Sequence, residues 1–326
     1  MGEWRYWFAE QRGTLLALGI FVLMFIIYTS NHPAGFTANV VQTASNKGVL
    51  LAFIAMAQTL VVLTAGIDLS VGMIFVLTNC LASWLVVGTP TETAFGVVAV
   101  LLVGVLCGAL NGAIVIYGRL QPIVATIATG AVYFGIALLL RPFPGGSVNE
   151  DLADALTGKL FGVIPSSLVA LVVVVFVVWV PFRRSVFGRA AYAAGSSEVA
   201  AYMSGVPIKR GKFLAYTLAG LLAAIGGLFL TFFTYTGEAA YASGNAYTLF
   251  SIAAVVLGGV SLFGGRGSAI GAIFGAFAFR TIGDLLFVFD FDPLWQPLFQ
   301  GVVLLVAVSL GAFALFRVKN RLEWFG

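Results

Sequence analysis

Ten long apolar runs follow one another along this chain, and they constrain its fold more than any other feature. The runs cover about 14–30, 48–66, 70–88, 94–117, 122–140, 165–182, 212–233, 248–264, 268–289 and 296–316. The hydrocarbon core of a bilayer is about 30 Å thick, so roughly 20 apolar residues form one helical span. Only 9% of the 326 residues are charged and 60% are hydrophobic, which leaves too little polar surface for a water-soluble globule. The sequence therefore predicts an all-α polytopic membrane protein with about ten transmembrane helices in a single membrane domain.

Basic residues predict how these helices are oriented. Residues 181–212 carry six basic residues and one acidic residue, and residues 317–323 carry three basic residues and one acidic residue. Loops rich in Lys and Arg remain in the cytoplasm. We therefore expect the loop of about 182–212 and both the N- and C-termini to be cytoplasmic, with the acidic loop around Glu150 on the opposite side. The first apolar run lacks a small-residue cleavage site, so we interpret it as a retained helix.

The chain lacks the motifs of common enzyme and metal sites. It contains no G-x-x-x-x-G-K-[ST] phosphate loop, no H-E-x-x-H and no G-x-S-x-G. Its single histidine, His32, has no neighbours with which to form a metal site, and Cys80 and Cys107 lie inside apolar runs as small hydrophobic residues. The sequence therefore argues against an enzyme. If such a chain moves a solute, the energy must come from an ion gradient or from another subunit.

The short segment Gly66-Ile67-Asp68-Leu69-Ser70 is all that separates the second and third apolar runs. Because a carboxylate next to hydrocarbon is costly, Asp68 should face the protein interior, a water path or the membrane interface. Gly66 and Gly72 permit a turn or a close helix approach, and Ser70 is placed to cap the next helix. Two interpretations stay open: a gate or break on a transport path, and a solvated hairpin turn at the cytoplasmic surface.

This region also has an internal echo. Residues 66–72 and 259–265 share the pattern G-x-x-L-x-x-G, and each lies at the end of an apolar run. Transporters are often built from repeats with discontinuous helices near the solute path. The echo is compatible with such a repeat.

Small and polar residues in the other spans predict helix packing more than solute contact. Glycines recur every four residues in two stripes, which are Gly104, Gly108 and Gly112, and Gly267, Gly271 and Gly275. Such stripes let membrane helices pack closely. Asn111 and Thr126 are polar groups near or within spans, and a threonine can bond to its own helix. Arg280 and Asp284 lie four residues apart, so we expect either an internal ion pair or anchoring at the outer interface.

The basic loop contains a predicted short helix over Ser197–Ser204. Ser197 precedes Glu198, the middle of the segment is rich in alanine, and Gly205 and Pro207 end the helix. A short helix of mostly small residues in a cytoplasmic loop suits docking into a cleft of a partner. The alternative is a plain amphipathic connector.

Five motifs occur in order along the chain. They are G-I-D-L-S-V-G at 66–72, L-N-G at 110–112, P-I-V-A-T-I-A-T at 122–129, G-x-x-x-x-A-x-G-x-x-x-x-A-A-x-x-S-G-V at 188–206, and I-A-A-V-V-L-G-G-V-S-L-F-G-G-R-G-S at 252–268. Together they resemble the permease subunits of ribose-type sugar ABC importers. The resemblance runs from about residue 40 to the C-terminus.

The resemblance implies a multi-pass permease of the bacterial inner membrane, with one transmembrane permease domain over residues 1–326 and no cofactor of its own. ATP and Mg would be bound by a separate cytoplasmic ATPase with two nucleotide-binding domains. The other implied partners are a second permease subunit, a periplasmic sugar-binding protein and membrane lipid, with no nucleic acid. Residues 195–205 match the family's ATPase-coupling stretch. The coupling residues carried over from it are Gly195, Ser197, Glu198, Ala200, Ala201 and Gly205.

The mechanism implied by the resemblance is alternating access for a monosaccharide. The predicted translocation path or gate consists of Gly66, Asp68, Ser70, Gly72, Asn111 and Thr126. Ser197 stands where relatives usually carry Asn, and Thr248 and Phe250 stand where they commonly carry acidic residues, which favours a non-identical second permease. The alternatives are a nucleoside or branched-chain amino-acid importer, or an ion-coupled secondary transporter using the few titratable groups of the spans, Asp68, Arg280 and Asp284.

Overall fold

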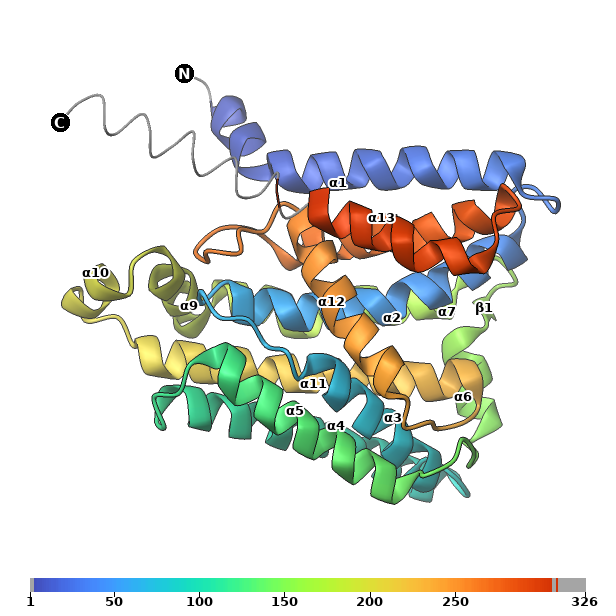
Figure 1. Cartoon of the computed structure of the whole chain (residues 1–326), viewed down its shortest axis with the longest axis horizontal. Helices are drawn as coiled ribbons and strands as arrows, with labels where there is room; N and C mark the ends of the chain where they lie inside the picture. Colours follow the sequence, from blue (N-terminus) through green and yellow to red (C-terminus); the bar gives the residue numbers. More distant parts are fainter. Residues whose placement is uncertain (1–2, 307–308, 310–326) are drawn as a thin grey trace.

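The computed structural model of this protein is a bundle of helices (Figure 1), and it describes residues 3–306 and residue 309. The first half contains α1 (Glu3–Asn31), α2 (Ala38–Val62), α3 (Val71–Leu85), α4 (Pro90–Ile116), α5 (Pro122–Leu140) and α6 (Glu150–Thr157). A two-residue hairpin follows, in which β1 (Lys159–Leu160) pairs antiparallel with β2 (Ile164–Pro165). The second half contains α7 (Ser166–Val174), the π-helix η1 (Val175–Trp179), α8 (Val180–Arg184), α9 (Val186–Ser196), α10 (Glu198–Met203), α11 (Ile208–Thr234), α12 (Tyr241–Leu257), α13 (Ala269–Val288) and the 3-10 turn η2 (Pro293–Trp295).

The all-α polytopic class predicted from the sequence is confirmed. Seven helices of the described residues are long and apolar enough to cross a membrane, with α7, η1 and α8 joined into one of them, Ser166–Arg184. Three further apolar helices are shorter, namely Val71–Leu85, Tyr241–Leu257 and Pro293–Val306. The ten apolar runs therefore correspond to ten helices, but two of them, α3 and α12, are too short for a full span. The tenth run continues beyond the described residues.

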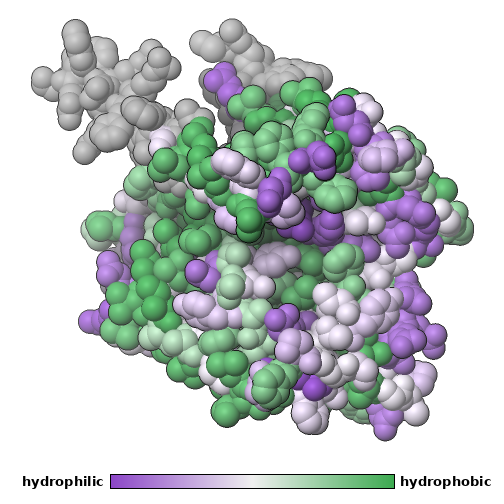
Figure 2. Space-filling view, turned by 45° about the vertical axis from the view of Figure 1, so that its right-hand side comes forward, coloured by the Kyte–Doolittle hydropathy of each residue, from purple (hydrophilic) through white to green (hydrophobic). Residues whose placement is uncertain are grey.

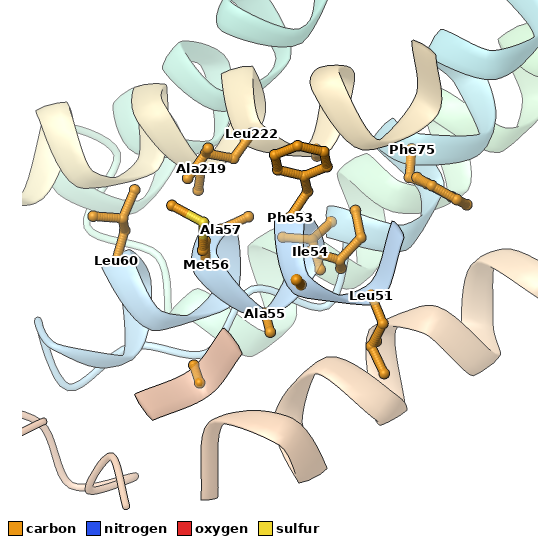
Figure 3. Packing of buried hydrophobic residues seen from close by; sticks show 14 of the residues in the cluster. Leu51, Phe53, Ile54, Ala55, Met56, Ala57, Leu60, Phe75, Ala219 and Leu222 are labelled. Carbon is orange, nitrogen blue, oxygen red and sulfur yellow. The ribbon is translucent and has the colours of Figure 1, made fainter. Parts of the chain in front are cut away.

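Helix α2 lies at the centre of the bundle. Nearly all of its apolar window is buried, and Phe53, Ile54 and Val61 have no exposed surface. Figure 3 shows Phe53 and Met56 of α2 pointing toward Leu222 and Ala219 of α11. A helix that is apolar on all sides gains most when it is surrounded by other helices, which explains its central position.

The main helix pairs reveal an internal repeat. Helix α11 packs against α2, α3 and α4, and α2 packs against α11, α12 and α13. Exchanging α2 with α11, α3 with α12 and α4 with α13 maps the larger contacts among these six helices onto one another. Helix α2 ends beside the α9–α10 segment, and α11 begins beside it (Figure 1). The unit α2–α4 therefore runs in the opposite direction to the unit α11–α13, as in the inverted repeats of transporters. The repeat differs from the sequence echo, since residues 66–72 precede α3 whereas residues 259–265 precede α13.

Glycines allow the closest of these helix contacts. A methyl group at Gly104 or Gly108 would lie 2.3 Å from an atom of α11, and one at Gly112 would lie 3.2 Å from α11. Gly271 and Gly275 approach the end of α12 in the same way. Gly267 differs from the predicted stripe: it lies in the loop before α13 with φ +123°, where it packs against Val260.

The two ends of the bundle are unlike each other. Helices α9 and α10 and the beginning of α1 lie at one end, and α6 and the β1–β2 hairpin lie at the other (Figure 1). Figure 2 brings the second end forward and shows hydrophilic residues gathered along its edge, while hydrophobic residues cover much of the side wall. This distribution suits a molecule whose side wall faces lipid and whose ends face water.

Candidate functional site: a buried polar break joined to a surface helix pair

The connection between α2 and α3 is a compact turn. Helix α2 ends at Val62, and Ala65 takes the left-handed conformation with φ +60°. The left-handed residue is Ala65 and not Gly66. Gly66 is needed for space, since a methyl group there would lie 2.8 Å from the hydroxyl of Tyr216. The turn places the residues that follow it inside the bundle.

Asp68 is the centre of a buried hydrogen-bond network. Asp68 is only 1% exposed. Its Oδ1 atom accepts hydrogen bonds from the backbone N–H of Ser70 at 2.8 Å and from the Ser70 hydroxyl at 2.6 Å. The amide of Asn111, in α4, donates to Ser70 Oγ at 2.7 Å and to Asp68 Oδ2 at 3.4 Å. The hydroxyl of Tyr133, in α5, donates to Asn111 Oδ1 at 2.9 Å. The interpretation of Asp68 as a solvated surface cap is therefore wrong.

Two further contacts attach this turn to other helices. The backbone N–H of Leu69 donates to the Thr126 hydroxyl of α5 at 2.9 Å, and that of Gly72 donates to the Thr248 hydroxyl of α12 at 3.1 Å. A methyl group at Gly72 would lie 1.9 Å from the carbonyl oxygen of Gly244, so glycine is required for α3 and α12 to meet. All six residues predicted for the path or gate thus lie on this turn or in contact with it.

Ser70 has a different role from the predicted one. It occupies the position before α3, but its side chain makes no capping hydrogen bond to that helix. Its hydroxyl instead connects Asp68 with Asn111. The sequence did not predict the contribution of Tyr133, because its distance from the motif gave no indication of which helices become neighbours.

The segment between α8 and α11 folds into two helices, α9 and α10, of which the sequence predicted only the second. Ser197 lies between them and accepts a hydrogen bond from the N–H of Ala200 at 3.3 Å, so it caps α10. Ala201 is buried against Ala194 and Ile208, whereas Val199, Tyr202 and Met203 are 76%, 75% and 81% exposed. Gly205 ends the segment with φ +72°. Helix α10 therefore presents an apolar face to its surroundings.

Gly195 joins this segment to the end of α2. A methyl group there would lie 2.1 Å from the carbonyl oxygen of Leu63 and 2.4 Å from the backbone nitrogen of Gly265. Gly265 itself donates from its N–H to the Leu63 carbonyl at 3.0 Å. Tyr192 of α9 adds a hydrogen bond to the Gly267 carbonyl at 2.6 Å. Backbones of three segments thus touch at one point, which we call the glycine joint (Leu63, Gly195, Gly264 and Gly265).

Asp284, at the far end of α13, pairs with a different residue from the one predicted. Asp284 accepts a hydrogen bond from Lys47 of α2 at 3.2 Å, so its partner is Lys47 and not Arg280. Lys47 lies at the start of an apolar run, and nothing in its local sequence indicated a partner 237 residues away.

The end of the bundle opposite α10 is closed by short polar contacts. Arg141 donates to the hydroxyl and the carbonyl of Ser83 at 2.9 and 2.8 Å and lies over the ring of Trp84. Tyr235, just after α11, donates a hydrogen bond to Asp154 of α6, which raises the pKa of the Tyr235 phenol. These contacts attach α6 and the loop before it to the membrane helices.

The chemistry available here is that of binding and movement. Among the residues that the structure describes, no cluster of three His, Cys, Asp or Glu side chains could hold a metal ion. Two short helices meet at a buried polar turn, and this turn is connected by backbone contacts to an exposed helix pair. An inverted-repeat bundle with these features defines a membrane permease.

The chain matches, over residues 40–308, the family described as the permease component of branched-chain amino acid transport systems. It belongs to this family, whose members are inner-membrane permease components of ATP-binding-cassette importers and not enzymes.

The relatives described below align with this chain over most of their length. The chain is 34% identical to the ribose import permease protein RbsC of Bacillus subtilis over 300 residues, which cover 90% of each chain. It is 34% identical to the fructose import permease protein FrcC of Rhizobium meliloti over 80% of this chain and 74% of the relative. It is also 34% identical to the autoinducer 2 import system permease protein LsrC of Klebsiella pneumoniae over 95% of this chain and 90% of the relative. No solved structure matches the chain at a significant level.

Proposed function

We propose that this chain is the membrane-spanning subunit of an ATP-driven importer that carries a monosaccharide by alternating access. The similarity to ribose and fructose import permeases over most of their length supports a small sugar as the solute. Asp68, Ser70, Asn111 and Thr126 supply hydroxyl, amide and carboxylate groups along the path. Gly66 and Gly72 allow the adjoining helices to meet and part there.

The observation that carries this proposal is the glycine joint. Helix α10 has an exposed apolar face, and Gly195 of the preceding helix touches the last carbonyls of α2. When a partner moves α10, the close backbone contact passes the motion to the turn that holds Asp68. Packed segments without intervening side chains transmit displacement well because they have little room to yield.

The proposed partners follow from this arrangement. A separate cytoplasmic ATPase with two nucleotide-binding domains binds ATP and Mg and contacts Gly195, Ser197, Glu198, Ala200, Ala201 and Gly205. A periplasmic sugar-binding protein docks at the opposite end, near α6. The α9–α10 segment and both termini are cytoplasmic, since the segment is strongly basic.

We further propose that the second permease of the complex is not identical to this chain. The hydroxyl of Thr248 is buried and accepts a hydrogen bond from the backbone N–H of Gly72 at 3.1 Å. The family resemblance implies that relatives commonly carry acidic residues near this position. Two copies would place this departure on both halves of the path. Mass spectrometry of the intact complex tests the proposal: a second permease sequence supports it, and two identical copies with full uptake refute it.

Uptake into proteoliposomes tests the function directly. The complex is purified with its ATPase and binding protein, reconstituted, and supplied with radiolabelled ribose, fructose, leucine or uridine. We expect uptake of a sugar that requires ATP and that persists when the proton gradient is collapsed. Uptake of leucine or uridine alone would reject the sugar assignment, and uptake driven by a proton or sodium gradient without ATP would reject the importer.

A further inference from the structure

Two cavities share a wall at the end of α13 that is remote from α10. The first has a volume of about 650 Å³, and its lining includes the polar side chains of Asn39, Thr43 and Lys47 together with apolar ones such as Leu286 and Phe287. The second has a volume of about 510 Å³ and is lined mainly by apolar side chains of α1, α7, η1 and α13. Arg280 and Asp284 line both cavities. A polar chamber and an apolar groove therefore meet at these two charged residues.

The charges at this junction do not balance. The carboxylate of Asp284 is paired with Lys47 at 3.2 Å. The Nε atom of Arg280 is buried and has no hydrogen-bond partner in the part of the chain that the structure describes. A buried guanidinium N–H without an acceptor is unfavourable, because the hydrogen bond that it made to water is not replaced. Arg280 thus supplies one positive charge that this site leaves for an anionic group.

The position of Arg280 suits a group at the membrane surface. It lies eight residues before the end of α13 at Val288, a rise of about 12 Å along the helix. Arginine at this depth directs its charged end toward the polar boundary of the bilayer. The polar chamber continues in that direction toward His32, just after α1, and Gln296, in the helix Pro293–Val306.

The apolar groove opens on the side wall of the bundle. Its outer edge is formed by Val172 of α7 and Phe176 of η1, which are 52% and 66% exposed. Its floor includes Phe25 of α1 and Phe274 and Phe277 of α13. Val175 and Phe176, the first two residues of the π-helix, line this edge. A groove of this kind fits a hydrocarbon chain.

We propose that a phospholipid with an anionic headgroup occupies the two cavities, with its phosphate against Arg280 and one acyl chain in the apolar groove. A guanidinium matches the oxygens of a phosphate with parallel hydrogen bonds. A free anionic solute would leave the groove empty, and a neutral detergent would leave Arg280 without an acceptor. The proposal concerns a lipid and holds whichever solute the complex carries.

Native mass spectrometry of the purified complex tests this site. The complex is titrated with dioleoyl phosphatidylglycerol or with dioleoyl phosphatidylcholine, which differ in net charge but not in their chains. We expect the wild type to retain phosphatidylglycerol at least tenfold better. Arg280→Gln should remove that difference, and Arg280→Lys should restore part of it. Arg210→Gln, a charge removal in α11 far from the cavities, should leave it unchanged.

A second variant tests the groove and decides the matter if Arg280→Gln does not fold. Val172→Trp fills the groove from its exposed edge and should lower retention of both lipids at least tenfold, whereas Leu106→Trp, on the exposed side of α4, should not. Equal retention of the two lipids by the wild type, or undiminished retention by Val172→Trp, would overturn the proposal. Inorganic phosphate that raises the melting temperature of the complex as much as phosphatidylglycerol does would also overturn it, in favour of a free anion.

Discussion

Asp68 is held by neighbours from its own turn and from two other helices. Ser70 donates two hydrogen bonds to it, Asn111 approaches both residues, and Tyr133 orients Asn111. A buried carboxylate is tolerated only when such donors surround it. These contacts make the turn sensitive to a change at Asp68, because the backbone N–H and the hydroxyl of Ser70 would be left inside the bundle without their acceptor.

The first prediction concerns this network. Asp68→Ala should lower the stability of the complex by about 3 kcal/mol, because the two Ser70 donors lose their acceptor while remaining buried and Asn111 loses its longer contact with Asp68. Asp68→Asn keeps one acceptor oxygen for the Ser70 N–H and should cost clearly less. The thermal midpoint of the purified complex measures both effects. Equal midpoints for Asp68→Ala and the wild type would show that the network contributes nothing to folding.

The sequence predicted the polar residues of this site better than their partners. Asp68, Ser70, Asn111 and Thr126 stood out because polar side chains are costly in apolar runs. The link from Tyr133 to Asn111 could not be predicted, since an apolar run fixes a helix but not the helix that packs beside it. For the same reason the sequence offered Arg280, on the same helix, as the possible partner of Asp284, whereas the actual partner of Asp284 is Lys47 of α2.

At the scale of elements, α10 is a short helix with one face packed against its neighbours and the other face exposed. Ala201 packs against Ala194 and Ile208, and Glu198 pairs with Lys212 at 2.7 Å. The local signals of this helix, a serine cap and a terminal glycine, were sufficient to predict it. The preceding α9 was missed, because its many small residues gave no clear apolar periodicity.

The second prediction distinguishes two roles of Glu198, which are its ion pair with Lys212 and a contact with the ATPase. An exposed pair such as Glu198–Lys212 contributes only about 0–1 kcal/mol, so Glu198→Lys should leave the protein folded. We expect it to reduce ATP-driven uptake because the ATPase meets an altered charge on α10. The double variant Glu198→Lys with Lys212→Glu restores a local pair of opposite orientation.

Uptake and ATP hydrolysis by both variants measure the effect. If the double variant recovers uptake while the single variant does not, the ion pair itself matters, and the contact with the ATPase through Glu198 is contradicted. Impaired coupling in both variants supports that contact.

At the scale of the whole molecule, the inverted repeat explains why two helices are short. Helices α3 and α12 meet at Gly72 and Gly244 in the middle of the bundle, and each belongs to one repeat. Length and composition predicted about ten transmembrane helices, whereas seven of the described helices are long and apolar enough to cross a membrane. The arrangement of α3 and α12 was not predicted, because the apolar runs that contain them are as long as those of full spans.

The third prediction concerns orientation. The two native cysteines are buried, so a membrane-impermeant thiol reagent should leave the wild type unlabelled in sealed cells. Asp151→Cys, at the α6 end, should react from outside, whereas Arg184→Cys, at the α9 end, should react only after the membrane is permeabilised. The basis is the excess of basic residues around α9 and α10. The reverse labelling pattern would place the α10 end outside.

The account depends most on the glycine joint, which connects α9 and α10 to the end of α2. Gly195→Ala adds one methyl group 2.1 Å from the Leu63 carbonyl, and Gly19→Ala adds the same group to a helix where nothing lies within 4 Å. The decisive measurement is the number of ATP molecules hydrolysed per solute imported by the two variants in proteoliposomes. We predict that Gly195→Ala keeps hydrolysis while uptake falls at least tenfold, and that Gly19→Ala matches the wild type. A Gly195→Ala complex with the ratio of the wild type would contradict the account.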